Sequence, residues 1–118
     1  MSYQRADRVK VLIQQVASEI LRELKDPRLG FVTITDVELS GDLKHAKIFV
    51  SILGNEEEHK STMEGLSSAT GFVRSELGKR IRLRHTPEIV FKFDSSIERG
   101  IRIAQILGQV TKEEKNIE

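Results

Sequence analysis

"FVTITDVELSGDLKHAKIFVSI", residues 31–52, contains the two clearest strand patterns of this 118-residue chain. Residues 31–39 are rich in β-branched side chains, and residues 44–52 alternate strictly, with one apolar face made of Ala46, Ile48, Val50 and Ile52. Both patterns predict β-strands. Because "SGDL" between them contains turn residues, we expect an antiparallel hairpin with one face packed and the other partly wet.

A helix is predicted before this hairpin, over residues 5–25. Apolar side chains recur there at helical spacing: Val9, Leu12, Ile13, Val16, Ile20 and Leu24. The helix should end before Pro27, because proline disfavours helical geometry in the residue before it and has no N–H to donate. "DPRLG", residues 26–30, is then expected to form a turn.

After the hairpin, Asn55 is a candidate cap for a helix that has three glutamates in its first turn. One apolar stripe runs along it through Gly71: Met63, Leu66, Ala69, Val73 and Leu77. Because glycine is unfavourable inside helices and is a place where they bend, we expect two helical segments joined by a kink at Ala69-Thr70-Gly71. Gly78 would cap the second segment. A different reading is that Gly71 makes room for a closely packed neighbour and Ala69 is a small core residue, and both readings can hold.

"EIVFKF", residues 88–93, predicts a third strand after Pro87. Ser95 and Glu98 form a candidate capping box for a last, broadly apolar helix. The predicted fold is therefore a single two-layer α+β domain, a three-stranded sheet with helices on one face. We expect the domain to span residues 1–110 and residues 111–118 to form a flexible polar tail.

The composition favours a soluble cytoplasmic protein. Cysteine is absent, which favours a reducing compartment, and the N-terminal residues carry charges where a secretory signal would be apolar. No stretch approaches the roughly 20 apolar residues of a membrane span.

The sequence shows no constellation typical of an enzyme. His45, His59 and His85 are scattered, and no Gly-rich phosphate loop or nucleophile motif is present. Paired carboxylates such as Glu56, Glu57 and Glu58 lie at a helix start, where capping explains them. We therefore expect no catalysis, no metal site and no cofactor.

The strongest functional signal is a basic segment, residues 74–84, most of which follows the predicted end of the helix at Gly78. It contains Arg74, Lys79, Arg80, Arg82 and Arg84 against Glu76 alone. In an extended backbone, Arg80, Arg82 and Arg84 would project to one side and could meet a phosphate backbone. The plain alternative is a solvated charged connection. Because aromatic residues are few, we expect contacts to backbone and shape rather than base stacking.

The predicted order of helix, strand, strand, two helices and strand is similar to the type II KH domain, but the helix junction "SSATGF" lacks the Gly-x-x-Gly loop that clamps nucleic acid. Two long segments, "DPRLGFVTITDVELSGDLKHAKIFVSIL" (26–53) and "GFVRSELGKRIRLRHTPEIVFKFDSSIERG" (71–100), resemble the bacterial ribosome-binding factor A family, as does the Ala69-x-Gly71 junction.

This resemblance implies a type II KH-like domain with an Ala-x-Gly helix–kink–helix, in which Ala69 and Gly71 set the bend. It implies a non-enzymatic ribosome biogenesis factor that binds the small (30S) ribosomal subunit and its 16S rRNA. Late subunit maturation, 16S rRNA 5′-end processing and cold adaptation would be its roles. The rRNA would meet Arg74, Lys79, Arg80, Arg82 and Arg84. We expect a monomer with no membrane partner and no small-molecule substrate.

Two other classes of function stay open at this point. The chain could be a protein–protein adaptor that acts through the apolar C-terminal helix, with the basic segment serving solubility. A small-molecule-sensing regulatory domain is the third possibility, although the sequence shows no polar pocket signature for it.

Overall fold

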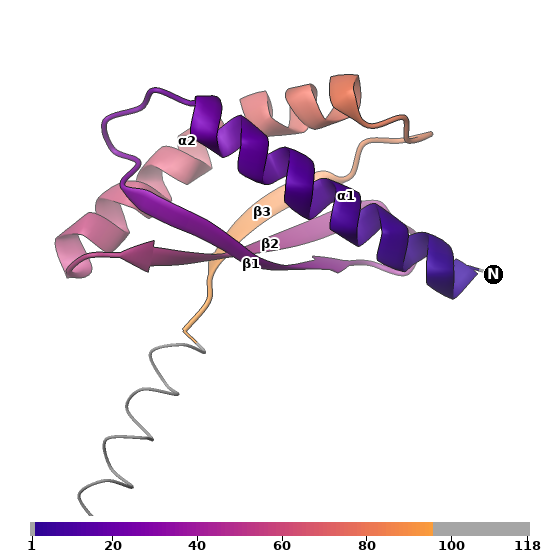
Figure 1. The fold of residues 1–118 in the computed structure, drawn as a ribbon, viewed down its shortest axis with the longest axis horizontal. Helices are drawn as coiled ribbons and strands as arrows, with labels where there is room; N and C mark the ends of the chain where they lie inside the picture. Colours follow the sequence, from indigo (N-terminus) through magenta and orange to yellow (C-terminus); the bar gives the residue numbers. More distant parts are fainter. Residues whose placement is uncertain (1, 96–118) are drawn as a thin grey trace, which may run out of the picture.

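The computed structural model describes residues 2–95, which form two helices and a three-stranded sheet (Figure 1). The elements, in chain order, are α1 (Ser2–Glu23), β1 (Phe31–Leu39), β2 (His45–Leu53), α2 (Glu56–Arg80) and β3 (Glu88–Phe93). The predicted α+β class and the three strands are confirmed. The predicted last helix and the polar tail lie outside the described residues.

The central strand of the sheet is β2, in the order β1-β2-β3. It pairs with β1 in antiparallel fashion and with β3 in parallel fashion, so that Ile48 lies opposite Val37 on one side and Phe91 on the other. The face predicted to be apolar is buried along its whole length: Ala46, Ile48, Val50 and Ile52. Both helices cover this face, and the other face carries the partly or fully exposed side chains.

A β-bulge at Thr35 changes the alternation of β1. Ile34 pairs with Val50 and Asp36 pairs with Phe49, which leaves Thr35 as the extra residue. Ile34 and Val37 are therefore both buried although they are three positions apart. The Thr35 hydroxyl donates a 2.7 Å hydrogen bond to Oδ2 of Asp94, just beyond β3, so the bulge is tied across the sheet.

The buried face of α1 differs from the predicted stripe at one position. Val9, Ile13, Ala17 and Ile20 are buried, whereas Leu12 is 44% exposed. At about 100° of rotation per residue, Leu12 lies roughly a quarter turn away from the centre of the buried face. The prediction for Leu12 was wrong because Ala17, a small residue with little weight in the pattern, faces the sheet in the next turn.

The "DPRLG" turn, residues 26–30, docks on α2. The buried Thr62 hydroxyl donates to the carbonyl of Arg28 at 3.2 Å and accepts from the N–H of Gly30 at 3.4 Å. One turn further, a Cβ on Gly65 would lie 3.1 Å from Leu29 Cδ2. Gly65 and Thr62 therefore let the turn approach the helix closely while its backbone groups stay hydrogen-bonded.

The start of α2 is as predicted, and its end is not. The Asn55 side chain accepts from the N–H of Glu58, and the Glu58 carboxylate accepts from the N–H of Asn55, which completes a capping box. The helix continues past Gly78 to Arg80, and the extended residue Ile81 caps it. Gly78 is thus not a cap, because the N–H of Ile81 still reaches the carbonyl of Leu77.

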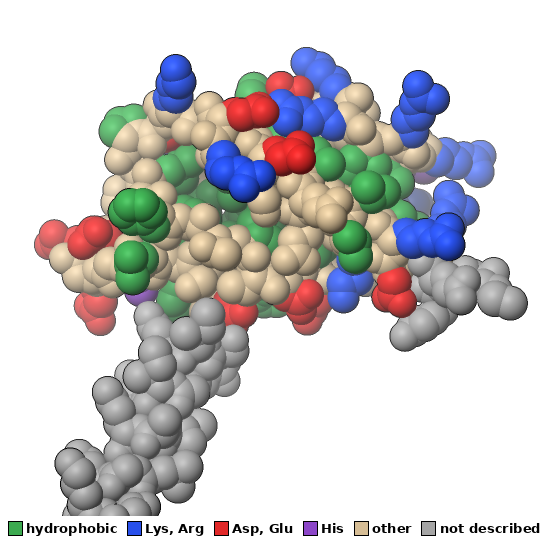
Figure 2. Space-filling view, viewed as in Figure 1, with side chains coloured by type: hydrophobic (Ala, Val, Ile, Leu, Met, Phe, Trp, Pro, Cys, Tyr) green, Lys and Arg blue, Asp and Glu red, His purple; other side chains and the backbone are tan. Residues whose placement is uncertain are grey.

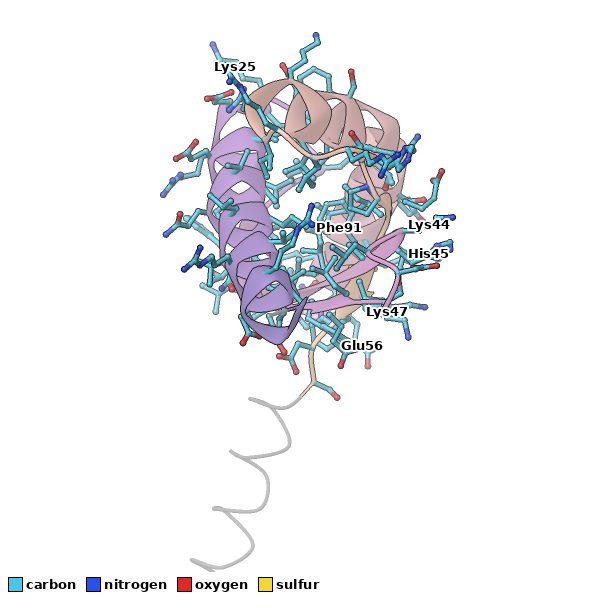
Figure 3. The ribbon with its side chains drawn as sticks, turned by 90° about the vertical axis from the view of Figure 1, so that its right-hand side faces the viewer. Lys25, Lys44, His45, Lys47, Glu56 and Phe91 are labelled. Atoms are coloured by element: carbon cyan, nitrogen blue, oxygen red, sulfur yellow. The ribbon has the colours of Figure 1, made fainter. Side chains whose placement is uncertain are left out.

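The two predicted helical segments are one unbroken helix, whose halves run in different directions (Figures 1 and 3). The Thr70 hydroxyl donates to the carbonyl of Leu66 at 2.9 Å, a bond of the type that bends helices. A Cβ on Gly71 would meet nothing within 4 Å among the described residues. Close packing therefore does not explain Gly71, and the role of Ala69 and Gly71 as kink residues stays a prediction.

Neither of the two described helices is both long enough and apolar enough to cross a membrane.

We expect Gly71→Ala to raise the free energy of unfolding by up to about 1 kcal/mol, because alanine is the better helix former and its methyl group meets open space. Gly78→Ala should lower it instead, because the new Cβ would lie 2.7 Å from Thr86 Oγ1. Urea denaturation of both variants measures the difference. A destabilised Gly71→Ala variant would mean that the bend of α2 requires glycine.

Candidate nucleic-acid interface

Charge is unevenly distributed along the molecule. The first turn of α2 carries Glu56, Glu57 and Glu58. At the opposite end lie the start of α1, the β1–β2 turn and the loop before β3, and Lys and Arg side chains are densest there (Figures 1 and 2). We call this surface the cationic end; its residues are Arg5, Lys44, Arg82, Arg84 and His85, all exposed.

The loop of residues 81–87 carries part of the predicted basic segment. Ile81 is buried and Leu83 packs against the core, whereas Arg82 and Arg84 are exposed. Burial and exposure alternate over these four residues, but the extended row expected for Arg80, Arg82 and Arg84 is interrupted by a turn at Arg82, because the N–H of Leu83 bonds to the carbonyl of Ile81 at 3.0 Å. This tight turn projects Arg82 outward.

Arg74 bonds to the protein itself, although 42% of its side chain remains exposed. Its guanidinium donates to the carbonyls of Pro87 at 3.2 Å and Thr86 at 3.1 Å, and it pairs with Glu88 at 3.3 Å. These carbonyls belong to the loop that leads into β3. Arg74 therefore positions the loop. Fewer of its guanidinium N–H groups remain available for the predicted contact with RNA.

Arg80 is also engaged. As the last residue of α2 it does not belong to the alternating row, and its guanidinium binds both carboxylate oxygens of Glu23 at 2.6 and 3.3 Å. This bond lowers the pKa of the Glu23 carboxyl and raises the pKa of Arg80. The pair joins the C-terminal ends of α1 and α2.

The other predicted basic residues differ in whether they form ion pairs or hydrogen bonds within the protein. Lys79 lies 4.0 Å from Glu76 and is 73% exposed, so this ion pair holds it weakly. Within the part of the chain that the structure describes, Arg82 and Arg84 form no ion pair or hydrogen bond. Whether the five predicted residues bind RNA stays a prediction, and Arg82 and Arg84 are the ones best placed for it.

No local pattern in the sequence marks Arg5, Lys44 and His85 as part of the same surface, because they come from three separate segments. In the structure, one hollow is lined by four residues of the cationic end: Arg5, Lys44, Arg84 and His85. Figure 3 views the molecule from this side and shows Lys44, His45 and Lys47 projecting together. Lys25 lies on the opposite side of the picture, away from them. Among residues 5–95, no group of three or more His, Asp or Glu side chains is arranged to hold a metal ion.

Comparison with known proteins agrees with this architecture. The model of the family described as "Ribosome-binding factor A" matches residues 5–107. The chain is 56% identical to ribosome-binding factor A of Natranaerobius thermophilus, over 98% of this chain and 89% of that protein. It is 51% identical to that of Halothermothrix orenii, over 98% and 96%.

Solved structures are similar as well. A Thermotoga maritima protein determined by NMR has a TM-score of 0.70 and 45% identity, covering 80% of this chain and 91% of that chain. Ribosome-binding factor A of Thermus thermophilus has a TM-score of 0.68 and 26% identity, covering 75% and 93%. A model of the Thermus thermophilus protein fitted into a map of a complex with the 30S subunit has a TM-score of 0.62 and 27% identity, covering 73% and 91%.

Fold and surface together define a small α+β domain with a one-sided three-stranded sheet and a cationic end. The chain belongs to the ribosome-binding factor A family, as the match over most of its length and the 56% identity show.

We expect Arg74→Lys to lower the free energy of unfolding by about 1–3 kcal/mol, because one ammonium group cannot replace both guanidinium bonds to the loop carbonyls. Arg82→Lys is the matched control and should stay within about 0.5 kcal/mol of the wild type. Urea denaturation measures both. Equal stability of the two variants would contradict the positioning role of Arg74.

The Glu23–Arg80 pair should make the free energy of unfolding depend on pH in the acidic range. Because Arg80 lowers the pKa of Glu23 from its ordinary value of 4.5, the pair contributes stability above that value, and this is lost as the pH falls through the lowered pKa. The stability difference between the wild type and Glu23→Gln should therefore shrink toward zero in acid. Thermal unfolding across pH 2–7 measures it, with Arg80→Met and the double variant completing a mutant cycle. A difference that is constant across this range would exclude the linkage.

Proposed function

We propose that this chain is a ribosome biogenesis factor that binds the small ribosomal subunit through its 16S rRNA. Its role would be in late subunit maturation, including 5′-end processing of the 16S rRNA, with the greatest need in the cold. It would act in the cytoplasm as a monomer, without catalysing a reaction of its own. Family membership supports this proposal, together with the fitted complex of the Thermus thermophilus relative with the 30S subunit.

The observation that carries the proposal is the cationic end. Arg82 and Arg84 project from a loop whose apolar residues are anchored in the core, and Arg74 holds the carbonyls at the end of that loop. Guanidinium groups presented in this way can form bidentate bonds with phosphate oxygens, and each neutralised phosphate releases counterions. A fixed loop also loses little conformational entropy on binding.

We propose residues 1–110 as the functional domain and residues 111–118 as a flexible polar tail; the family match over residues 5–107 supports the proposed extent of the domain. The alternative function, an adaptor that acts through the C-terminal helix, concerns residues outside those the structure describes.

We expect the wild-type protein to co-sediment with small ribosomal subunits at low salt and to dissociate steeply as salt rises at constant magnesium. The double variant Arg82→Glu, Arg84→Glu should bind more weakly, and the slope of log affinity against log salt should fall by about 2. The matched control is Lys25→Glu, Lys60→Glu, which reverses two exposed charges away from the cationic end.

If the two double variants are retained equally on the subunits at every salt concentration, the assignment of RNA binding to the cationic end is contradicted. Wild-type protein that stays in the supernatant with both mature and precursor subunits would contradict the proposed function itself.

A further inference from the structure

A hollow of about 170 Å³ opens in the cationic end, where α1, the β1–β2 turn and the loop of residues 81–87 meet. Its exposed margin carries the cations Arg5, Lys44 and Arg84, the imidazole of His85 and one carboxylate, that of Asp42. Its more buried part is apolar and consists of Val9, Leu43 and Leu83. The hollow thus combines a positive margin with an apolar floor.

The size of the hollow limits what can occupy it. Small-molecule and cofactor sites usually measure about 300–1,000 Å³, so this one suits a single flat group rather than a whole cofactor. A second hollow of about 320 Å³ adjoins it, and the two share Lys44 and His85. A chain that places one group in the first hollow can therefore continue along the second.

Leu43, which forms part of the apolar floor, has an unfavourable backbone conformation for leucine. Its φ of 61° lies in the left-handed region, where glycine or asparagine is favoured over leucine. The turn is fixed by hydrogen bonds: the N–H of Leu43 bonds to the carbonyl of Ser40 at 2.9 Å, and the N–H of His45 bonds to the Ser40 hydroxyl at 3.0 Å. The side chain is only half-buried and lies against the hollow. Leucine therefore occupies a left-handed position that hairpin turns of this kind require, and it places an apolar side chain at the hollow.

Asp42 favours a nucleotide over a phosphate group without a base as the occupant of the hollow. Its Oδ1 accepts from the Ser40 hydroxyl at 2.6 Å and from the N–H of Lys44 at 3.0 Å, and these bonds lower the pKa of the carboxyl, which stays ionised. Among the described residues, none donates to Oδ2. An ionised carboxylate repels phosphates and acidic peptides, but it accepts hydrogen bonds from the exocyclic amine of a base.

We infer that this hollow receives one unpaired nucleotide of the bound RNA. Its base lies against Leu43 and His85, within reach of Asp42, and its phosphates lie at Lys44 and Arg84. Imidazole rings are among the side chains on which unstacked bases stack in RNA complexes. The inference rests on the proposed function and adds that the strand is single at this point, because a paired base cannot enter the hollow.

The test uses a fluorescein-labelled 10-nucleotide RNA of mixed sequence, single-stranded or as one strand of a hairpin stem, with binding followed by anisotropy. Leu43→Gly removes the floor and suits the left-handed backbone, so the turn should stay folded. We expect this variant to lose at least about fivefold in affinity for the single strand, because the apolar contact between the leucine side chain and the base is lost, and little for the hairpin stem. Leu43→Asn, which also tolerates this backbone, should behave in the same way.

The double variant Lys44→Ala, Arg84→Ala should weaken both RNAs and lower the salt slope by about 2. Lys25→Ala, Lys60→Ala is its control, with the same loss of charge elsewhere on the surface.

Unchanged single-strand affinity of Leu43→Gly, together with weakened binding by Lys44→Ala, Arg84→Ala, would overturn the inference, since the hollow would then contact phosphate alone. Wild-type protein that co-sediments with subunits but binds the single strand no better than the stem would overturn it as well. Both results would leave the proposed function standing, whereas only failure of the wild type to co-sediment counts against that function.

Discussion

Burial of one face of β2 governs how the other elements are arranged. Ala46, Ile48, Val50 and Ile52 are almost completely removed from water, and the backbone on either side of them is paired with β1 and β3. Apolar burial of this kind is the main favourable term in folding. It requires both helices on the same face, and the antiparallel and parallel partners of β2 then fix where each connection must run.

Those connections produce the functional surface. The parallel pairing of β2 and β3 requires α2 to cross back over the sheet, so its acidic start and its basic end lie at opposite ends of the molecule. The same crossing brings the loop of residues 81–87 beside the β1–β2 turn and the start of α1. Arg74 then ties that loop to α2 through the carbonyls of Thr86 and Pro87. The cationic end is thus a consequence of topology, and its cations come from three segments.

The basic residues predicted as one group separate into two kinds in the structure. Arg74 and Arg80 bind carbonyl or carboxylate oxygens of the protein itself, whereas Arg82 and Arg84 project from the surface. Guanidinium groups form several directed bonds, so a cluster of arginines in a sequence can serve internal architecture as well as phosphate. Only the positions of Glu23, Thr86 and Pro87 in space distinguish these uses. The glycines separate in the same way, because Gly65 and Gly78 face close neighbours while Gly71 faces open space.

The sequence alone determined the elements that depend on local patterns. Alternation predicted β2 and its buried face, Asn55 and the glutamates after it predicted the start of α2, and the residues after Pro87 predicted β3, because burial on one face and capping leave periodic or local marks. Tertiary structure decided the rest. The bulge at Thr35 shifted the phase of β1, Leu12 turned outward where Ala17 packs inward, and α2 continued past Gly78 to Arg80. The cationic end also needed the fold, since Arg5, Lys44 and Arg84 are far apart along the chain and meet only after β2 has paired on both sides.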